Sequence, residues 1–195
     1  MTLKHRQIRK LLIANRGEIA VRVERACREL GIRSVAVYSD ADRKCLHVLM
    51  ADEAFPLHGA TATETYLAQD KIIEVAKKAG VEAIHPGYGF LSENPVFAER
   101  LRNEGIIFVG PHAQAIRTLG DKTAARKLAA KLRIPTAAGT PEPLNDETQA
   151  LYFAEQLGFP VLLKAAAGGG GKGMRVVRSR EEISANLRTA NSEAK

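Results

Sequence analysis

The chain has 195 residues, of which 45% are hydrophobic and 26% charged, and its formal net charge is +7. That apolar content excludes an intrinsically disordered chain, while 2 Cys and 8 Pro exclude disulfide-framework and collagen-like proteins. No stretch of about 18 consecutive apolar residues occurs, so we expect no membrane-spanning segment. Cys27 and Cys45 lie in no CxxC motif, so we expect two reduced cysteines in a cytosolic or organelle-matrix protein, and of these locations we predict the cytoplasm.

Short apolar runs alternate with helical patterns over the first 110 residues. Ile19, Val23 and Cys27 recur at every fourth position, which places them on one helix face, and Gly31 is expected to end that helix. The alternation predicts an α/β fold with an open, Rossmann-like parallel sheet and helices on both faces. The predicted strands are residues 11–14, 34–38, 54–57, 81–85 and 106–109, the third an edge strand because it contains Pro56. The predicted helices are residues 19–30, 67–79 and 96–103.

The pattern changes after about residue 111. Two consecutive helices, a link rich in Pro and Gly, and a further helix precede two strands that flank a glycine run, and a last helix follows. These elements are predicted at 113–119, 122–132, 134–144, 147–157, 161–165 and 175–178, with the last helix starting near 180. Too few residues remain for a large core, so we predict a thin second unit.

The glycine run between the last two strands carries the most chemistry. Gly168, Gly170 and Gly173 satisfy the spacing GxGxxG, but a dinucleotide loop must be followed by a helix, and residues 174–177 are typical of a strand. A strand–glycine loop–strand hairpin can instead fold over a phosphate chain, because its amides approach a ligand closely. A flexible turn without a ligand is the alternative. Lysine and arginine side chains around the run favour phosphate: Lys164, Lys172 and Arg175.

Two loops that follow predicted strands are candidates for a site, because ligands of such sheets bind at the carboxyl ends of the strands. The segment Asn15-Arg16-Gly17-Glu18 is interpreted as a strand–helix turn, with Asn15 near the cap. The segment His85–Asn94 combines two glycines and two aromatics with His85 and Glu93. It either lines a site or forms a long turn with Ser92 or Asn94 capping the next helix, and both descriptions can hold together.

The first helix also has oppositely charged residues at i, i+4 spacing. Arg25 and Glu29 form one such pair, and Glu24 and Arg28 form the other. The simplest interpretation is two solvated ion pairs within the helix, worth a few tenths of a kcal/mol each.

Four segments occur in an order that resembles a known family. They are Leu12-Ile-Ala-Asn-Arg-Gly-Glu-Ile-Ala20, His85–Asn94, Gly120-Asp-Lys122 and residues 164–174. Together they are similar to the N-terminal part of biotin carboxylase, an ATP-grasp ligase that occurs as a subunit of acetyl-CoA carboxylase, an enzyme of fatty acid biosynthesis, and in related carboxylases. The resemblance implies a pre-ATP-grasp domain at 1–120 and the start of an ATP-grasp domain, with its lid, at 121–195.

The resemblance also implies a reaction and its site residues. Mg-ATP phosphorylates bicarbonate to carboxyphosphate, whose CO₂ carboxylates biotin on a carrier protein. Residues implied to bind ATP are Lys122, Lys164, Gly170, Gly171, Lys172 and Met174. Arg25 and Glu29 match positions at the family's homodimer contact, and the loop with His85 and Glu93 would border the bicarbonate and biotin region. Implied partners are the biotin carboxyl carrier and the carboxyltransferase.

The sequence departs from the family in two respects. Ala166 stands where a serine is common. The family's Mg²⁺-binding carboxylates, its base for bicarbonate and its biotin-facing arginine match nothing here, so we expect no metal ligands and no turnover in this chain alone. Another ATP-grasp ligase and a non-catalytic nucleotide-binding module are the alternatives. Nucleic acid is not an expected partner, because no basic stripe carries interleaved aromatics.

Overall fold

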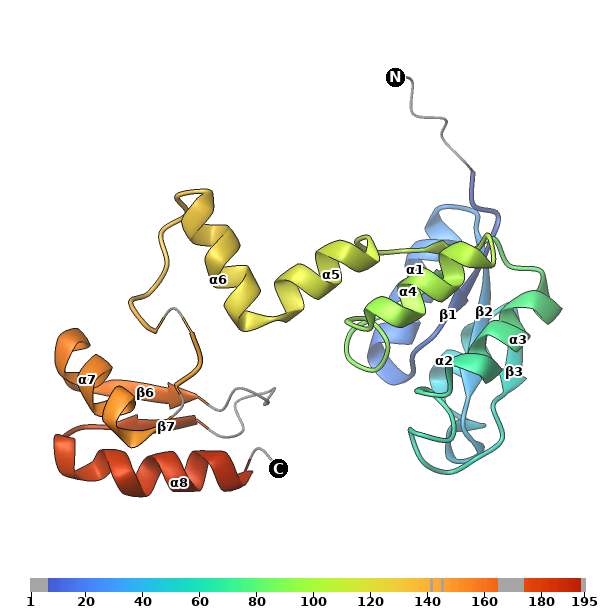
Figure 1. Ribbon diagram of the computed structural model, residues 1–195. Helices are drawn as coiled ribbons and strands as arrows, with labels where there is room; N and C mark the ends of the chain where they lie inside the picture. Colours follow the sequence, from blue (N-terminus) through green and yellow to red (C-terminus); the bar gives the residue numbers. More distant parts are fainter. Residues whose placement is uncertain (1–6, 141, 145, 165–173, 194–195) are drawn as a thin grey trace. The chain divides into compact units, whose positions relative to one another are not determined.

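The computed structural model describes residues 7–193 apart from 141, 145 and 165–173, and it divides the chain into two compact units, 1–117 and 118–195 (Figure 1). Among the described residues, no helix combines the length and apolar character that a bilayer crossing requires.

The first unit is built on a five-stranded sheet in which all neighbouring strands are parallel. The strand order is β3-β2-β1-β4-β5, so the strand at the edge next to β2 is β3, which contains Pro56 as predicted. The strands are β1 (Lys10–Ile13), β2 (Arg33–Tyr38), β3 (Glu53–Pro56), β4 (Ala83–His85) and β5 (Ile107–Phe108). The predicted parallel α/β sheet is therefore confirmed.

Alternate residues of the central strands enter two separate cores. Leu12, Val35 and Ile84 belong to one core, whereas Leu11, Ile13 and Ala83 belong to the other. This alternation follows from the pleat, which points successive side chains to opposite faces of a sheet. The first core is closed by α3 (Gln69–Ala79) and α4 (Pro95–Asn103), and the second by α1 (Gly17–Glu29), so helices cover both faces (Figure 1).

A short segment between β2 and β3 was not predicted. It contains a 3₁₀ turn, η1 (Asp40–Asp42), and a five-residue helix, α2 (Leu46–Met50), which packs beside α1. A helix of five residues spans little more than one turn, so it cannot repeat an apolar position often enough to be recognised.

The second unit contains a small antiparallel sheet with helices. The strands β6 (Val161–Lys164) and β7 (Met174–Val177) pair in antiparallel register, which confirms the predicted hairpin strands. Its core includes Leu163, Val177 and Ile183. The helical elements from residue 113 onward are α5 (Ala113–Gly120), which spans the division between the units, α6 (Lys122–Lys131), α7 (Glu147–Leu157), η2 (Arg180–Glu182) and α8 (Ile183–Glu193).

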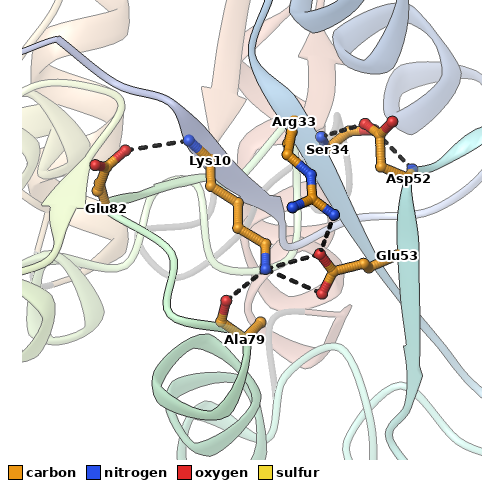
Figure 2. A network of polar contacts seen from close by, with 7 residues as sticks. All are labelled: Lys10, Arg33, Ser34, Asp52, Glu53, Ala79 and Glu82. Carbon is orange, nitrogen blue, oxygen red and sulfur yellow. Dashed lines mark hydrogen bonds and ion pairs between the residues drawn. The ribbon is translucent and has the colours of Figure 1, made fainter.

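Charged residues link the amino ends of the strands in the first unit (Figure 2). Lys10 Nζ donates to Glu53 Oε2 at 3.0 Å and to the carbonyl of Ala79 at 2.6 Å, and Arg33 donates to Glu53 Oε1 at 2.8 Å. Asp52 accepts from the backbone N–H and the hydroxyl of Ser34 at 2.7 and 2.9 Å. These contacts connect β1, β2 and β3 with the C-terminal end of α3, so ion pairs and hydrogen bonds hold the strands together at this end of the sheet.

Candidate functional site

The carboxyl ends of β1 and β4 mark the point where the chain changes direction across the sheet. From β1 the chain proceeds to β2 and β3 on one side, and it then crosses to β4 and β5 on the other. The loops after β1 and β4 therefore diverge, and open α/β sheets bind their ligands in the crevice that such a divergence leaves. Asn15 follows β1, and His85 is the last residue of β4.

The Asn15 side chain joins these two loops. It is 3% exposed, and its Nδ2 donates to the carbonyls of Pro86 and Tyr88 at 2.8 and 2.9 Å. The segment is the predicted strand–helix turn and Asn15 lies near the cap, directly before Arg16, which occupies the N-cap position of α1 without a side-chain cap. The backbone of this turn leaves Asn15 pointing toward the neighbouring strand end, where two carbonyls need a donor.

Gly87 lies against the Asn15 amide and has a φ of +67°. A Cβ at this position would stand 2.6 Å from Asn15 Nδ2, so any larger residue would displace the amide. The Gly87 N–H donates to His85 Nδ1 at 3.0 Å, and burial lowers the pKa of the His85 imidazole. At neutral pH His85 is therefore uncharged, with Nδ1 as the acceptor.

A second polar cluster lies beside this loop and centres on Asp42, which is buried. Arg16 donates to Asp42 from Nε at 2.6 Å and from its terminal nitrogen, and Asp42 also accepts from the Tyr66 hydroxyl at 2.6 Å. These hydrogen bonds, those from Arg16 above all, hold the pKa of Asp42 well below its usual range. Burial and the Asp42 bond raise the pKa of Tyr66 to about 12, so Asp42 is ionised and Tyr66 is a donor.

The Tyr66 ring connects this cluster to the loop after β4. It stacks on Phe90 with ring centroids 5.2 Å apart, and Phe90 has a φ of +42°, unusual for a bulky residue. The Tyr88 side chain is 63% exposed, although its carbonyl is held by Asn15. The loop therefore has a fixed backbone and presents an aromatic side chain to solvent.

The end of the same loop starts the next helix. Asn94 Oδ1 accepts from the N–H of Phe97 at 3.0 Å, which confirms the predicted capping of α4. Glu93 is exposed beside it. The end of the segment is therefore a helix cap, and its beginning is tied to the end of β1 by Asn15, while its lining of a site stays a prediction.

The residues implied to contact ATP belong to the second unit. Lys164 ends β6 and pairs in register with Met174, which starts β7, and both are exposed. Lys122 is the first residue of α6, whose N-terminus is capped by Asp121 through the N–H of Ala124 at 2.7 Å. Gly170, Gly171 and Lys172 lie outside the described residues.

The described part of this unit meets only one of the two requirements of Mg-ATP, a cation for the phosphates and ligands for the metal. An exposed lysine at the end of a hairpin strand fits a phosphate chain, because its ammonium group is a mobile point charge. For Mg²⁺ the fit fails among the residues described, since no three carboxylate, imidazole or thiol groups converge there.

The charges of α1 differ from the sequence-based interpretation. Arg25 and Glu29 are exposed, and no ion pair between described residues joins them. Glu24 is 2% exposed, and neither of its carboxyl oxygens has a hydrogen-bond partner. Burial raises its pKa to about 7, and Arg28 offsets only part of this shift. Neither predicted i, i+4 pair forms, and for Glu24 the reason is that α1 turns its side chain inward with Ala20 and Cys27.

Comparisons with known proteins find a matching family for each of the two units. Residues 7–116 match the family described as "Biotin carboxylase, N-terminal domain", and residues 121–195 match "Carbamoyl-phosphate synthase L chain, ATP binding domain". Biotin carboxylase 1 of Bacillus subtilis is 50% identical over 96% of this chain and 42% of its own length. The acyl-coenzyme A carboxylase alpha3 subunit of Mycobacterium leprae is 51% identical over 96% of the chain and 31% of its own length.

Solved structures give the same result. The biotin carboxylase of Campylobacter jejuni superimposes with a TM-score of 0.92 at 41% identity, over 96% of this chain and 42% of that one. The biotin carboxylase domain dimer of the Hydrogenobacter thermophilus 2-oxoglutarate carboxylase, in complex with MgADP, ADP and bicarbonate, gives 0.91 at 46%, over 97% and 42%.

A parallel sheet followed by part of an ATP-binding domain defines the general class, and the matches define the family within it. The chain belongs to the biotin carboxylase family, whose members are ATP-dependent ligases, and it corresponds to the N-terminal part of the biotin carboxylase domain of biotin-dependent carboxylases. It spans less than half the length of the relatives it matches.

Proposed function

We propose that this chain supplies ATP-binding groups to a biotin carboxylase, which uses ATP and bicarbonate to carboxylate biotin on a carrier protein through carboxyphosphate. The observation that carries the proposal is the succession of the two matched domains, with Lys164 and Met174 side by side at the end of the β6–β7 hairpin where the glycine run begins and ends. The division at 120/121 fits the gap between the two matched regions. The carboxyl acceptor differs among the relatives, so the proposal is confined to the step they share.

Each predicted residue has a place in this proposal. Lys122, Lys164, Lys172 and Met174 contact ATP, and Gly170 and Gly171 cover its phosphates. His85 and Glu93 border the region where bicarbonate and biotin react. The Mg²⁺ that accompanies ATP would neutralise phosphate charge, and the described residues of this chain do not form its site. We accordingly expect the isolated polypeptide to bind ATP without turning it over.

ATP binding by the purified chain tests the proposal. Titration calorimetry with ATP is expected to give saturable binding that persists at high salt, and Lys164→Ala is expected to weaken it about tenfold, the usual effect of losing a charge-assisted hydrogen bond. Lys131→Ala is the matched control, because Lys131 is an exposed lysine at the C-terminal end of α6, away from Lys122 at its N-terminus. Equal affinities for the two variants, or no binding by the parent chain, would refute the proposal.

We further propose that α1 forms a homodimer contact through Arg25 and Glu29. Both side chains are exposed, and Arg25 lines a hollow of about 640 Å³ between α1 and α2. One relative is described as a biotin carboxylase domain dimer. Arg25→Glu is expected to lower the dimer fraction in sedimentation equilibrium, whereas Arg102→Glu, an exposed arginine on α4, is not.

The partners and the location follow from the same family. The biotin carboxyl carrier and the carboxyltransferase are the proposed partners, as in multi-part carboxylases. Cys27 and Cys45 are both free, which fits the proposed cytoplasmic location. Some relatives are mitochondrial, so cell fractionation is the direct test.

A further inference from the structure

We propose that Asn15 is a positioning residue that fixes the loop of residues 86–90, and with it His85 and Tyr88, at the carboxyl ends of β1 and β4. The inference rests on the proposed function for the role of that loop. Asn15 contacts this loop and is itself buried.

The Asn15 amide has only one orientation that satisfies its neighbours. Nδ2 donates to the carbonyls of Pro86 and Tyr88, which uses both of its hydrogens, while Oδ1 accepts from the N–H of Arg16 at 2.9 Å. A reversed amide would place its oxygen against two carbonyl oxygens. Asn15 therefore acts as a clamp whose two donors fix carbonyls two residues apart in the loop.

The clamp reaches His85 through the backbone. The Ala14 N–H donates to the His85 carbonyl at 2.9 Å, which fixes the start of the loop against the end of β1. Gly87 lies between the two clamped carbonyls, and its N–H donates to His85 Nδ1 at 3.0 Å. The position of that N–H, and so the tautomer of His85, depends on how Asn15 holds the residues on either side.

The far end of the loop is held by the residue that follows Asn15. Arg16 pairs with Asp42, Asp42 accepts from the Tyr66 hydroxyl, and the Tyr66 ring stacks on Phe90. Two successive residues after β1 thus control both ends of the 86–90 loop. Asn15 acts directly on its backbone, and Arg16 acts through two intermediates.

Nitrogen NMR of the His85 ring in the purified chain tests the inference, with the signal assigned from His85→Gln. The parent chain is expected to show the Nε2–H tautomer and a pKa below the usual 6.5. Asn15→Ala removes both donors, so a mixture of tautomers, a pKa closer to 6.5 and exchange of the Gly87 amide at least tenfold faster are expected. Burial lowers this pKa, so a loosened loop that admits water is expected to raise it.

Ser34→Ala is the matched control. Ser34 is 4% exposed and hydrogen-bonds Asp52 at the opposite end of the same sheet, so its loss lowers stability without touching the loop. Gly87→Ala is the second variant, because its added methyl displaces the Asn15 amide from the other side, and it is expected to give the same His85 signature. Asn15→Asp keeps the shape but sets oxygen against both carbonyls, and a larger increase in Gly87 exchange is expected.

Unchanged His85 tautomer, pKa and Gly87 exchange in a folded Asn15→Ala chain would overturn the inference. Unfolding of both Asn15→Ala and Gly87→Ala while Ser34→Ala folds would also overturn it, because Asn15 would then support the whole domain. None of these measurements uses ATP or biotin. A chain that binds no ATP would therefore refute the proposed function and leave the His85 result unchanged.

Discussion

The two ends of the five-stranded sheet use charged and polar side chains differently. At the amino end, Lys10 and Arg33 both pair with Glu53 and join the strands (Figure 2). At the carboxyl end, Asn15 and Asp42 hold loops whose own side chains, Tyr88 among them, face solvent. Similar residue types therefore stabilise strands at one end and hold loops in place at the other, the end at which sheets of this kind bind ligands.

Removing the Asp42 charge is expected to have the largest effect on stability. Asp42→Asn leaves Arg16 without its carboxylate and weakens the bonds from Tyr66 and Ser39, so we expect a loss of about 3 kcal/mol in urea unfolding at neutral pH. The pKa of Asp42 is lowered by folding, so this stability is present above the unfolded pKa of 3.8 and is lost as the pH falls below it.

Asp40→Asn provides the control for this variant. Asp40 is an exposed carboxylate two residues away that accepts from the N–H of Gly59 at 3.0 Å. Its substitution is expected to cost much less. Equal losses for the two variants would show that the Asp42 cluster contributes no more than a surface loop, and the contrast between the two ends of the sheet would fail.

Glu24 lies near the amino end of the sheet, but its carboxyl group has no hydrogen-bond partner there. Its ionisation is expected to change stability by nearly as much as the loss of the Asp42 charge, with the opposite dependence on pH. Its pKa is raised from 4.5 to about 7, so the native state binds the proton more tightly than the unfolded chain does. Stability is therefore highest below about pH 4.5 and falls by roughly 3 kcal/mol as the pH rises to 7. Glu24→Gln, which stays neutral, is expected to be more stable than the parent at pH 8 and similar to it at pH 4.5.

The measurement is urea unfolding of both proteins across this pH range. Glu29→Gln is the matched control, because Glu29 lies on the same helix and is exposed. A parent chain whose stability does not change between pH 4.5 and 8 would show that the carboxylate of Glu24 finds a partner on ionisation.

The sheet could be predicted from the sequence because apolar runs and helical spacing are local signals. Residues 11–14 were predicted as a strand, and β1 covers Lys10–Ile13. The five residues of α2 left no such signal. Glu24 was misassigned for a related reason: i, i+4 spacing identifies neighbours on a helix but does not determine which face is buried.

The clamp between Asn15 and the 86–90 loop could not be predicted from either segment alone. Asn15 and Pro86 are separated by 71 positions, and their contact depends on β1 pairing with β4 rather than only with β2. The available signal was Gly87, since a glycine two residues after the end of a strand can indicate close approach by another group. Only the strand order, which places β1 beside β4, identifies the Asn15 amide as the group that approaches Gly87.

Within the amino-end network, Lys10 is expected to contribute more than its neighbours. Its side chain is 19% exposed and its ammonium group bridges Glu53 and the carbonyl of Ala79. Lys10→Met keeps much of the aliphatic packing and leaves both acceptors short of a donor, so we expect a loss of about 1–2 kcal/mol in urea unfolding. Lys44→Met, an exposed lysine near α2, is the control, and the same loss there would remove any special role for Lys10.

Arg33 is expected to show the smallest effect, although it pairs with the same Glu53. Its side chain is 63% exposed, so solvent and salt screen its bond to Glu53 Oε1. Arg33→Met is expected to cost less than about 0.5 kcal/mol, and about 0.5 M NaCl is expected to abolish the difference from the parent chain, whereas the loss caused by Lys10→Met is expected to persist. If Arg33→Met proved as costly as Lys10→Met at high salt, the network would act as one unit. Contacts at the amino end would then be cooperative, and the distinction between Lys10 and Arg33 would fail.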